Sequence, residues 1–496
     1  MALGNGKSKA RMSTVLDTFY ARWRLDSGVV TWMHDDGESP PERLLQSIWL
    51  QQRVLRDRLK TLDGRMVRVL HPGFQSLEGG PDFRGAVIQM GDTAPVSGDI
   101  EVDIRCSGWR AHGHHRNPAF RSVMLHVVWD GETAATEGPP VLCLRYALDA
   151  PPGELSLWLG AEGSSEIPAR FQGKCCAPLA QLGSADLADL LGQAARVRVQ
   201  SKASQMKARA RQVGWEQALW EGVFRALGYK HNVWPMQRLA ELRPRWMTPE
   251  ASVLELQARL LGIGGLLPME LTRREAKVDE YLKRVWDFWW RERGDYSDCQ
   301  LPRSFWKFHG LRPANAPQRR LALAAHWSRL ADLPAELERW CDARLQPGQE
   351  MPSLARVFQS PKDDFWSWHW SFRSPRLEQR RSLVGEGRIT DLAVNVVLPW
   401  LWARAAAVGH EDTKARIEER YLNWPLAQDN SVLSLARQRL LAGHGTKVLC
   451  RASHQQGVLQ IVRDFCDNST TVCDGCKLPA LVENWQTQGR MSAFTY

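Results

Sequence analysis

Long apolar runs are missing from this sequence of 496 residues. No window reaches the roughly 18 consecutive apolar residues of a transmembrane helix, so we predict no membrane span and no membrane partner. The N-terminal segment MALGNGKSKARMSTVLDTFYARWRL also lacks the apolar stretch of a secretory signal peptide. We therefore expect the protein to be cytoplasmic.

Motifs of several common enzyme classes are also absent. The glycine-rich turns GGPDFRG (79–85) and LGIGGLL (261–267) match neither a P-loop nor a dinucleotide-binding fingerprint. The chain contains no G-x-S-x-G and no H-E-x-x-H motif. The sequence therefore offers no support for an ATPase, an acyl hydrolase or a zincin.

Cysteine and tyrosine are scarce, with 10 and 7 residues respectively. So few cysteines in a chain of this length do not make a disulfide framework, and cytosolic thiols stay reduced. Tryptophan is abundant, with 23 residues. We expect these side chains to anchor helix packing, and a stacking surface for bases or sugars is the alternative. The net charge of +10, without a long basic tail, favours an anionic partner such as nucleic acid.

The hydrophobic period changes along the chain and indicates its organisation. Residues 42–60 have helical spacing, and strand patterns follow at 66–73, 82–90, 98–106, 123–130 and 141–148. These segments predict an α/β or α+β domain with a mixed sheet. From residue 184 onward helical patterns dominate. The predicted parts are an extension (1–40), the α/β domain (41–150), a linker (151–183), a helical Trp-rich domain (184–445) and a Cys-rich metal-binding segment (446–496).

Three carboxylates fall on neighbouring predicted strands. Asp82 opens the strand at 82–90, and Glu101 and Asp103 lie two residues apart on the next strand. The period of two puts Glu101 and Asp103 on the same face of the sheet. Clustered carboxylates repel one another, so a shared site implies a cation, and hard oxygen ligands suit Mg²⁺ or Mn²⁺. Ordinary charges on an exposed strand face are the alternative.

Histidines concentrate near these carboxylates. His112 and His114 lie in SGWRAHGHHRNPAF, and His126 lies in the apolar strand VMLHVV. Histidine serves as a metal ligand or as a general base near neutral pH. We expect at least one of these three residues to be functional, although a histidine inside an apolar strand is more often a core residue.

The helix predicted at 190–212 is unusually basic and is a candidate for holding a phosphate backbone. Its basic residues are Arg196, Arg198, Lys202, Lys207, Arg209 and Arg211.

A cysteine set near the C-terminus has the spacing of a metal site. Cys466, Cys473 and Cys476 form C-x6-C-x2-C, and Cys450 is a candidate fourth ligand. Cys-x2-Cys in a reducing compartment lets two thiolates reach one ion. Structural Zn²⁺, a 4Fe–4S cluster and free thiols in a terminal hairpin are the alternatives. The adjacent Cys175 and Cys176 are interpreted as incidental.

The order of helix 42–60, Asp82 and Glu101 resembles the PD-(D/E)xK nuclease superfamily. In that superfamily a helix leads into a three-stranded meander, an Asp lies near the start of one strand, and an acidic-x-Lys triplet lies on the next. The resemblance implies a restriction-endonuclease-like fold that uses Mg²⁺ or Mn²⁺. The chain departs from the superfamily at the Lys position, which is Asp103.

A second resemblance covers residues from about 42 to 476. The segments that carry it include ERLLQSIWLQ, GGPDFRGAVI, SGDIEVDIRCSGWRAHGHHRNPAF, GWEQALWEGVFRALGYKHNVWPMQRLAELRP, GLRPANAPQRRLA and QQGVLQIVRDFC followed by CDGC. On these segments the chain is identified as a member of a bacterial family of unknown function. The resemblance brings no established activity. It implies that Asp82, Glu101, His112, His114 and the terminal cysteines are features common to the family.

Two functional hypotheses follow from these patterns. The first is a metal-dependent nuclease, or a nuclease-derived nucleic-acid-binding protein, with Mg²⁺ or Mn²⁺ on Asp82 and Glu101 and with Asp103 or His126 completing the site. The second is a non-catalytic interaction or scaffold protein with a structural metal site. The two differ in whether Asp82, Glu101 and a histidine converge within metal-ligand distance.

Overall fold

The computed structural model groups the chain into two compact units, Met1–Ala208 with Glu418–Tyr496, and Arg209–Ile417. The predicted Cys-rich segment at 446–496 thus falls in the same unit as the α/β domain. The structure describes residues 18–30, 33, 39–76, 79–131, 138–159, 172–229, 231–271, 280–330, 332–346, 348–359, 361–427, 431–442, 449–466 and 473–492.

A six-stranded mixed sheet forms the centre of the α/β domain, with the order β1-β3-β4-β5-β6 and β2 paired to β3. β1, β3 and β4 form an antiparallel meander, and β5 and β6 join it in parallel. The strands are β1 (Val67–His71), β2 (Phe74–Gln75), β3 (Phe83–Met90), β4 (Val96–Arg105), β5 (Val123–Asp130) and β6 (Val141–Cys143). The predicted mixed sheet is therefore confirmed.

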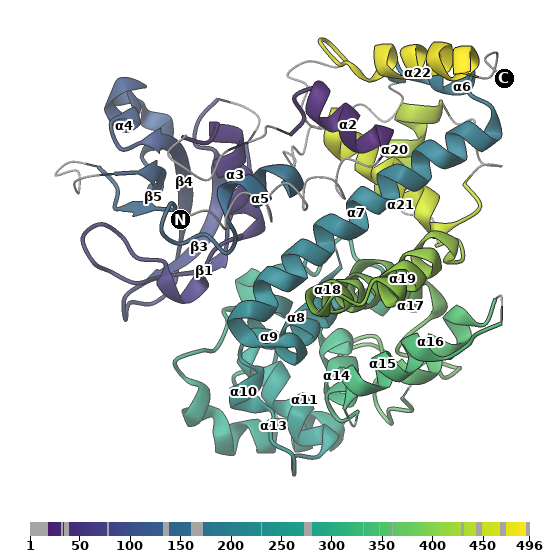
Figure 1. The fold of residues 1–496 in the computed structure, drawn as a ribbon. Coiled ribbons are helices and arrows are strands. Elements are labelled where there is room, and N and C mark those ends of the chain that lie inside the picture. The colour runs from purple at the N-terminus through teal and green to yellow at the C-terminus, as the bar shows by residue number, and fades with distance from the viewer. Residues whose placement is uncertain are drawn as a thin grey trace. The chain divides into compact units, whose positions relative to one another are not determined.

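Helices complete this domain and bury one face of the sheet. Leu45, Ile48 and Trp49 of α3 (Glu42–Gln51) are fully buried in one core with Ile100 and Val102 of β4. α3 is shorter than the predicted helix 42–60, because Gln52 adopts a left-handed conformation with φ of 51°. The crossover between β4 and β5 contains α4 (Gly108–Ala111), which lies at one end of β4 (Figure 1), and the 3₁₀ turns η2 (His114–Arg116) and η3 (Pro118–Phe120).

A second core in the same unit consists of helices from both ends of the chain. Leu190, Leu440 and Val458 are among its buried residues. Its elements are α2 (Phe19–Asp26), α6 (Cys176–Ala180), α7 (Ser184–Val213), α20 (Ser431–Leu441), α21 (Ala452–Ile461), η8 (Val462–Cys466) and α22 (Leu478–Ser492). The predicted linker contains α5 (Pro152–Trp158) as well as α6.

The other unit is helical. Tryptophans such as Trp220, Trp246 and Trp327 are among its largest fully buried side chains, so they anchor the packing of helices. Its elements are α8 (Trp215–Gly228), α9 (Val233–Glu241), α10 (Arg243–Trp246), α11 (Val253–Ile263), α13 (Glu280–Glu292), α14 (Pro317–Ser328), α15 (Leu333–Asp342), α16 (Glu350–Phe358), α17 (Glu386–Leu392), η7 (Ala393–Val397) and α18 (Leu398–Val408), and α19 (Glu411–Asn423) spans its boundary. The predicted large helical portion is confirmed.

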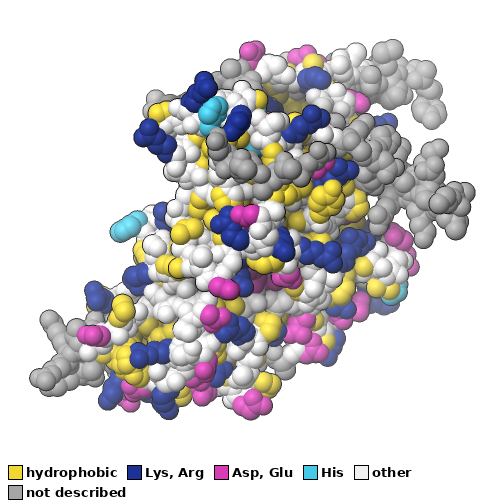
Figure 2. Space-filling model, turned by 90° about the vertical axis from the view of Figure 1, so that its left-hand side faces the viewer, with side chains coloured by type: hydrophobic (Ala, Val, Ile, Leu, Met, Phe, Trp, Pro, Cys, Tyr) yellow, Lys and Arg dark blue, Asp and Glu magenta, His cyan; other side chains and the backbone are white. Residues whose placement is uncertain are grey.

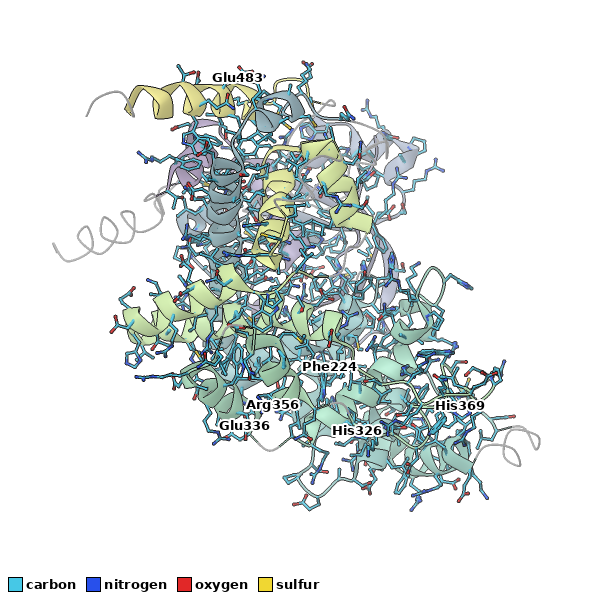
Figure 3. The ribbon with its side chains drawn as sticks, turned by 90° about the vertical axis from the view of Figure 1, so that its right-hand side faces the viewer. Phe224, His326, Glu336, Arg356, His369 and Glu483 are labelled. Atoms are coloured by element: carbon cyan, nitrogen blue, oxygen red, sulfur yellow. The ribbon has the colours of Figure 1, made fainter. Side chains whose placement is uncertain are left out.

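Two features of the helical unit bear on the predictions. Within the described residues, the helical stretch Glu386–Val408 is long and apolar enough to cross a membrane, and 61% of its apolar window is buried inside the protein. A buried polar network also crosses the unit, where the imidazole of His326 on α14 lies 2.8 Å from a carboxylate oxygen of Asp363. Figure 3 labels His326 among the side chains of this unit.

Candidate metal centre

Asp82 and Glu101 are brought together by the pairing of β3 with β4. Phe83 is paired with Ile100, so Asp82 lies beside Glu101 across the two strands. The backbone N–H of Asp82 donates to Oε2 of Glu101 at 3.1 Å, and the backbone N–H of Val102 donates to Oδ2 of Asp82 at 3.0 Å. The predicted convergence of these two carboxylates is thus present, and both are held by backbone donors.

Asp103 lies on the same strand and contacts two imidazoles. Its Oδ2 is 2.9 Å from Nε2 of His126, which is buried, and its Oδ1 is 3.1 Å from Nδ1 of His112. The side chain of His112 is 55% exposed. Gly108 allows this contact, because a Cβ atom there would lie 2.6 Å from the Asp103 carboxylate. Asp103 therefore orients two imidazoles, that of the buried His126 and that of the solvent-facing His112.

His114 lies in the crossover segment and points at Glu101. Its Nε2 is 3.1 Å from Oε1 of Glu101, yet this buried nitrogen makes no hydrogen bond of acceptable geometry. The ring of Phe120 stacks on it at 4.0 Å between centroids, and the ring of Trp109 lies 5.5 Å away. These two aromatic contacts fix the orientation of the imidazole. A buried ring nitrogen without a hydrogen bond is unusual and marks a position where a ligand fits.

Two polar residues of α3 also reach the centre, and sequence reasoning missed both. Gln46 donates to Oδ1 of Asp82 at 2.9 Å and to the carboxylate of Glu42 at 3.2 Å. Glu42 and Gln46 are four residues apart, so they share one helix face. That spacing is the only signal in the sequence, and it does not reveal which strand the face meets.

The electrostatics of the centre indicate an excess of negative charge. Burial raises the pKa of Glu101 to about 8, and the neighbouring Asp82 adds to this effect. Burial likewise raises the pKa of Asp82 to about 7, although the backbone N–H of Val102 opposes it. Burial lowers the pKa of His114, which favours the neutral imidazole with a lone pair available to a ligand. A cation between these groups would relieve the repulsion.

The donor atoms fit a divalent cation. Ring nitrogens of His112 and His114 and a carboxylate oxygen of Asp103 all lie within 4.8 Å of one another. Glu101 adds an oxygen 3.1 Å from His114. The set combines carboxylates with imidazole, a combination that suits Mn²⁺ or another transition metal better than Mg²⁺.

The basic residues predicted to hold phosphate lie on α7, and several already have partners within the protein. Arg196 pairs with Glu418 at 2.8 Å, and Arg209 pairs with Glu221 at 2.8 Å. Arg198 and Lys202 both donate to the side chain of Gln456. Lys207 is half-buried and also has a partner, while Arg211 is exposed. On the face drawn in Figure 2, basic and acidic side chains are interspersed. These contacts reduce the number of cations on α7 that are available to phosphate.

The predicted cysteine ligands do not all lie together. Cys466, Cys473 and Cys476 line one pocket, and Cys175 lines it with them. Cys450 is exposed, and its Sγ lies 3.9 Å from Nδ1 of His454. The pair Cys175–Cys176 was interpreted from the sequence as incidental, and the fold brings the first of the two into the cysteine set.

The sheet and its polar centre define an α/β protein with a candidate metal centre of carboxylates and imidazoles. The chain belongs to the protein family described as "Protein of unknown function (DUF2851)", which matches residues 42–430. This match confirms the predicted family membership. No curated protein and no solved structure matches the chain.

Proposed function

We propose that the protein is a metal-dependent phosphodiester hydrolase, or a nucleic-acid-binding protein derived from one. The observation that carries this proposal is the convergence of Asp82, Glu101 and Nε2 of His114, which lies 3.1 Å from Oε1 of Glu101. Each buried carboxylate with a raised pKa costs stability, which favours a functional reason for burying the two together.

The order of elements also supports a restriction-endonuclease-like fold as part of the proposal. α3 leads into the meander β1-β3-β4, Asp82 stands at the start of β3, and Glu101 lies on β4. This is the order that the PD-(D/E)xK resemblance implies. The Lys of that motif is replaced by Asp103, which lies beside His112.

Each residue of the centre has a distinct role in the proposed reaction. Asp82, Glu101 and His114 would hold the cation, and the other donors of the centre, Asp103 and His112, would serve proton transfer instead of ligation. The cation, when bound, would polarise a phosphoryl oxygen and lower the pKa of a bound water. Asp103, itself bonded to His126, orients His112 through Nδ1 and leaves Nε2 of His112 to accept a proton. Water attacks phosphorus and gives a proton to His112, the bond from phosphorus to the leaving oxygen breaks, and His112 then returns that proton to the leaving oxygen.

A cytoplasmic location belongs to this proposal. The described residues contain no disulfide, as expected of thiols in the reducing cytoplasm. Nucleic acid in the same compartment would be the substrate.

A cleavage assay tests the proposal. Labelled single- and double-stranded DNA and RNA are incubated with Mn²⁺ or Mg²⁺ and with wild type, Glu101→Gln or His114→Gln. Asp130→Asn is the matched control, because Asp130 is on β5 in an exposed ion pair with Arg145. We expect cleavage by wild type and the control, stronger with Mn²⁺, and its loss in the two variants of the centre.

Two other outcomes would contradict parts of the proposal. Cleavage that survives in Glu101→Gln would exclude this centre as the site of reaction. If wild type cuts no substrate but binds nucleic acid in a salt-dependent manner, the protein is a binder and not a hydrolase.

A further inference from the structure

Four thiols from distant parts of the chain line a single pocket. Cys175 directly precedes α6, Cys466 ends η8, and Cys473 and Cys476 flank an Asp-Gly turn. The pocket is also lined by Arg439, Phe465, Leu478 and Pro479. α6 and α22 lie side by side in Figure 1, which brings these segments together.

Local geometry shows that the sulfur atoms face the same place. A Cβ atom on Gly173 would lie 3.1 Å from Sγ of Cys175 and 3.6 Å from Sγ of Cys473. Cys473 has a φ of 62°, in the left-handed region that is uncommon for a residue other than glycine. Such backbone strain persists where the surrounding structure or a ligand holds it.

Two nearby cysteines are excluded from the set by their own contacts. The thiol of Cys176 donates to the carbonyl oxygen of Arg439 at 2.9 Å. Cys450 is exposed and does not line the pocket. The two residues therefore provide matched controls for the four thiols.

One backbone donor also faces the set, because the N–H of Leu478 donates a hydrogen bond to the sulfur of Cys476. Backbone donors to a thiolate are a feature of metal–sulfur sites, where they tune the ligand.

The spacing of the sulfur atoms distinguishes two kinds of metal. Zn²⁺ held by four thiolates at about 2.3 Å places the sulfurs about 3.8 Å apart. In the described part of the chain, no three of the four cysteine sulfurs lie within 4.8 Å of one another. An iron–sulfur cluster separates its cysteine sulfurs further, because metal ions and sulfides lie between them.

We propose that Cys175, Cys466, Cys473 and Cys476 are the four thiolate ligands of a 4Fe–4S cluster. The cluster ties the segment before α7 to the C-terminal part of the chain. It is separate from the carboxylate and imidazole centre and does not depend on the proposed function.

Metal and sulfide analysis of the full-length protein tests this assignment. The protein is prepared without oxygen as wild type, Cys175→Ser, Cys473→Ser, Cys176→Ser and Cys450→Ser. We expect about four irons and four acid-labile sulfides per chain, with a brown colour, in wild type and in the last two variants. The content should fall severalfold in Cys175→Ser and Cys473→Ser.

Other results would overturn the assignment. Loss of iron in Cys450→Ser with retention in Cys175→Ser would replace the proposed fourth ligand. One zinc per chain, lost in Cys175→Ser, would keep the four ligands and exclude the cluster. If Cys175→Ser does not fold, X-ray absorption at the iron edge of the wild type decides the question, because nitrogen or oxygen neighbours would contradict four thiolate ligands.

Discussion

Replacing Glu101 by glutamine should stabilise the metal-free protein, although glutamine removes a candidate ligand. Glu101 is buried beside Asp82, and burial raises its pKa from an ordinary 4.5 to about 8. An acid with a raised folded pKa contributes full stability below its unfolded pKa and loses it as the pH rises towards the folded value. The destabilisation by Glu101 should therefore grow from about pH 5 to about pH 8.

The size of the stability change follows from the raised pKa of Glu101. Each pKa unit corresponds to about 1.4 kcal/mol, so fully charging Glu101 costs at most about 5 kcal/mol. This cost is reduced because Glu101 and Asp82 titrate as a coupled pair and because the surroundings relax. We therefore expect Glu101→Gln to raise the free energy of unfolding by about 1–2 kcal/mol. For a unit of this size that gain raises the midpoint of thermal unfolding by about 2–8 °C.

Thermal unfolding in chelator and then in Mn²⁺ measures both parts of the prediction. The free energy of unfolding of wild type should rise by about 2.7 kcal/mol at a metal concentration of about 100 times the dissociation constant. That of Glu101→Gln should rise little. Asp130→Asn, which alters an exposed ion pair, should behave like wild type within about 1 kcal/mol. If Glu101→Gln is no more stable than this control at about pH 8 in chelator, or keeps the full response to Mn²⁺, the reasoning about the centre is refuted.

Three further variants test other parts of the structure. His112→Gln should retain the Mn²⁺-induced shift in unfolding temperature while cleavage falls by about 10²–10⁴-fold, and an equal loss of metal binding would make His112 a ligand. Gly457→Ala should destabilise the protein by more than 1 kcal/mol in urea unfolding, because its Cβ would lie 2.1 Å from a backbone oxygen of α7, whereas Gly192→Ala on α7 meets nothing within 4 Å and should stabilise it by about 0.5–1 kcal/mol. Equal effects of the two glycine variants would contradict the packing of α21 on α7.

Burial acts to raise the pKa of Asp363, but hydrogen bonds led by that from His326 lower it overall. Its contribution is therefore present above the ordinary pKa of 3.8 and lost as the pH falls through the lowered value, so Asp363→Asn should cost about 1–3 kcal/mol near neutral pH and little at about pH 2. A difference from wild type that does not depend on pH would exclude the charge as the cause.

Local pattern in the sequence determined the elements and much of the candidate centre. The alternation along 98–106 predicted that Glu101 and Asp103 share a face, and the fold has both in contact with histidines. Local periodicity suffices here because residues two apart on a strand always face the same way. The end of α3 escaped prediction, since the left-handed conformation of Gln52 leaves no trace in hydrophobic period.

Only the tertiary structure decided which distant groups meet. Glu42 and Gln46 reach Asp82 because α3 packs on this sheet, and Cys175 rather than Cys450 joins the other cysteines because helices from both ends of the chain share one core. The partners of Arg196 and Arg209 on α7 likewise come from other helices. Periodicity along the chain fixes which way a side chain faces within its own element. Contacts between elements depend on the packing of whole faces, and distance along the sequence does not encode that packing.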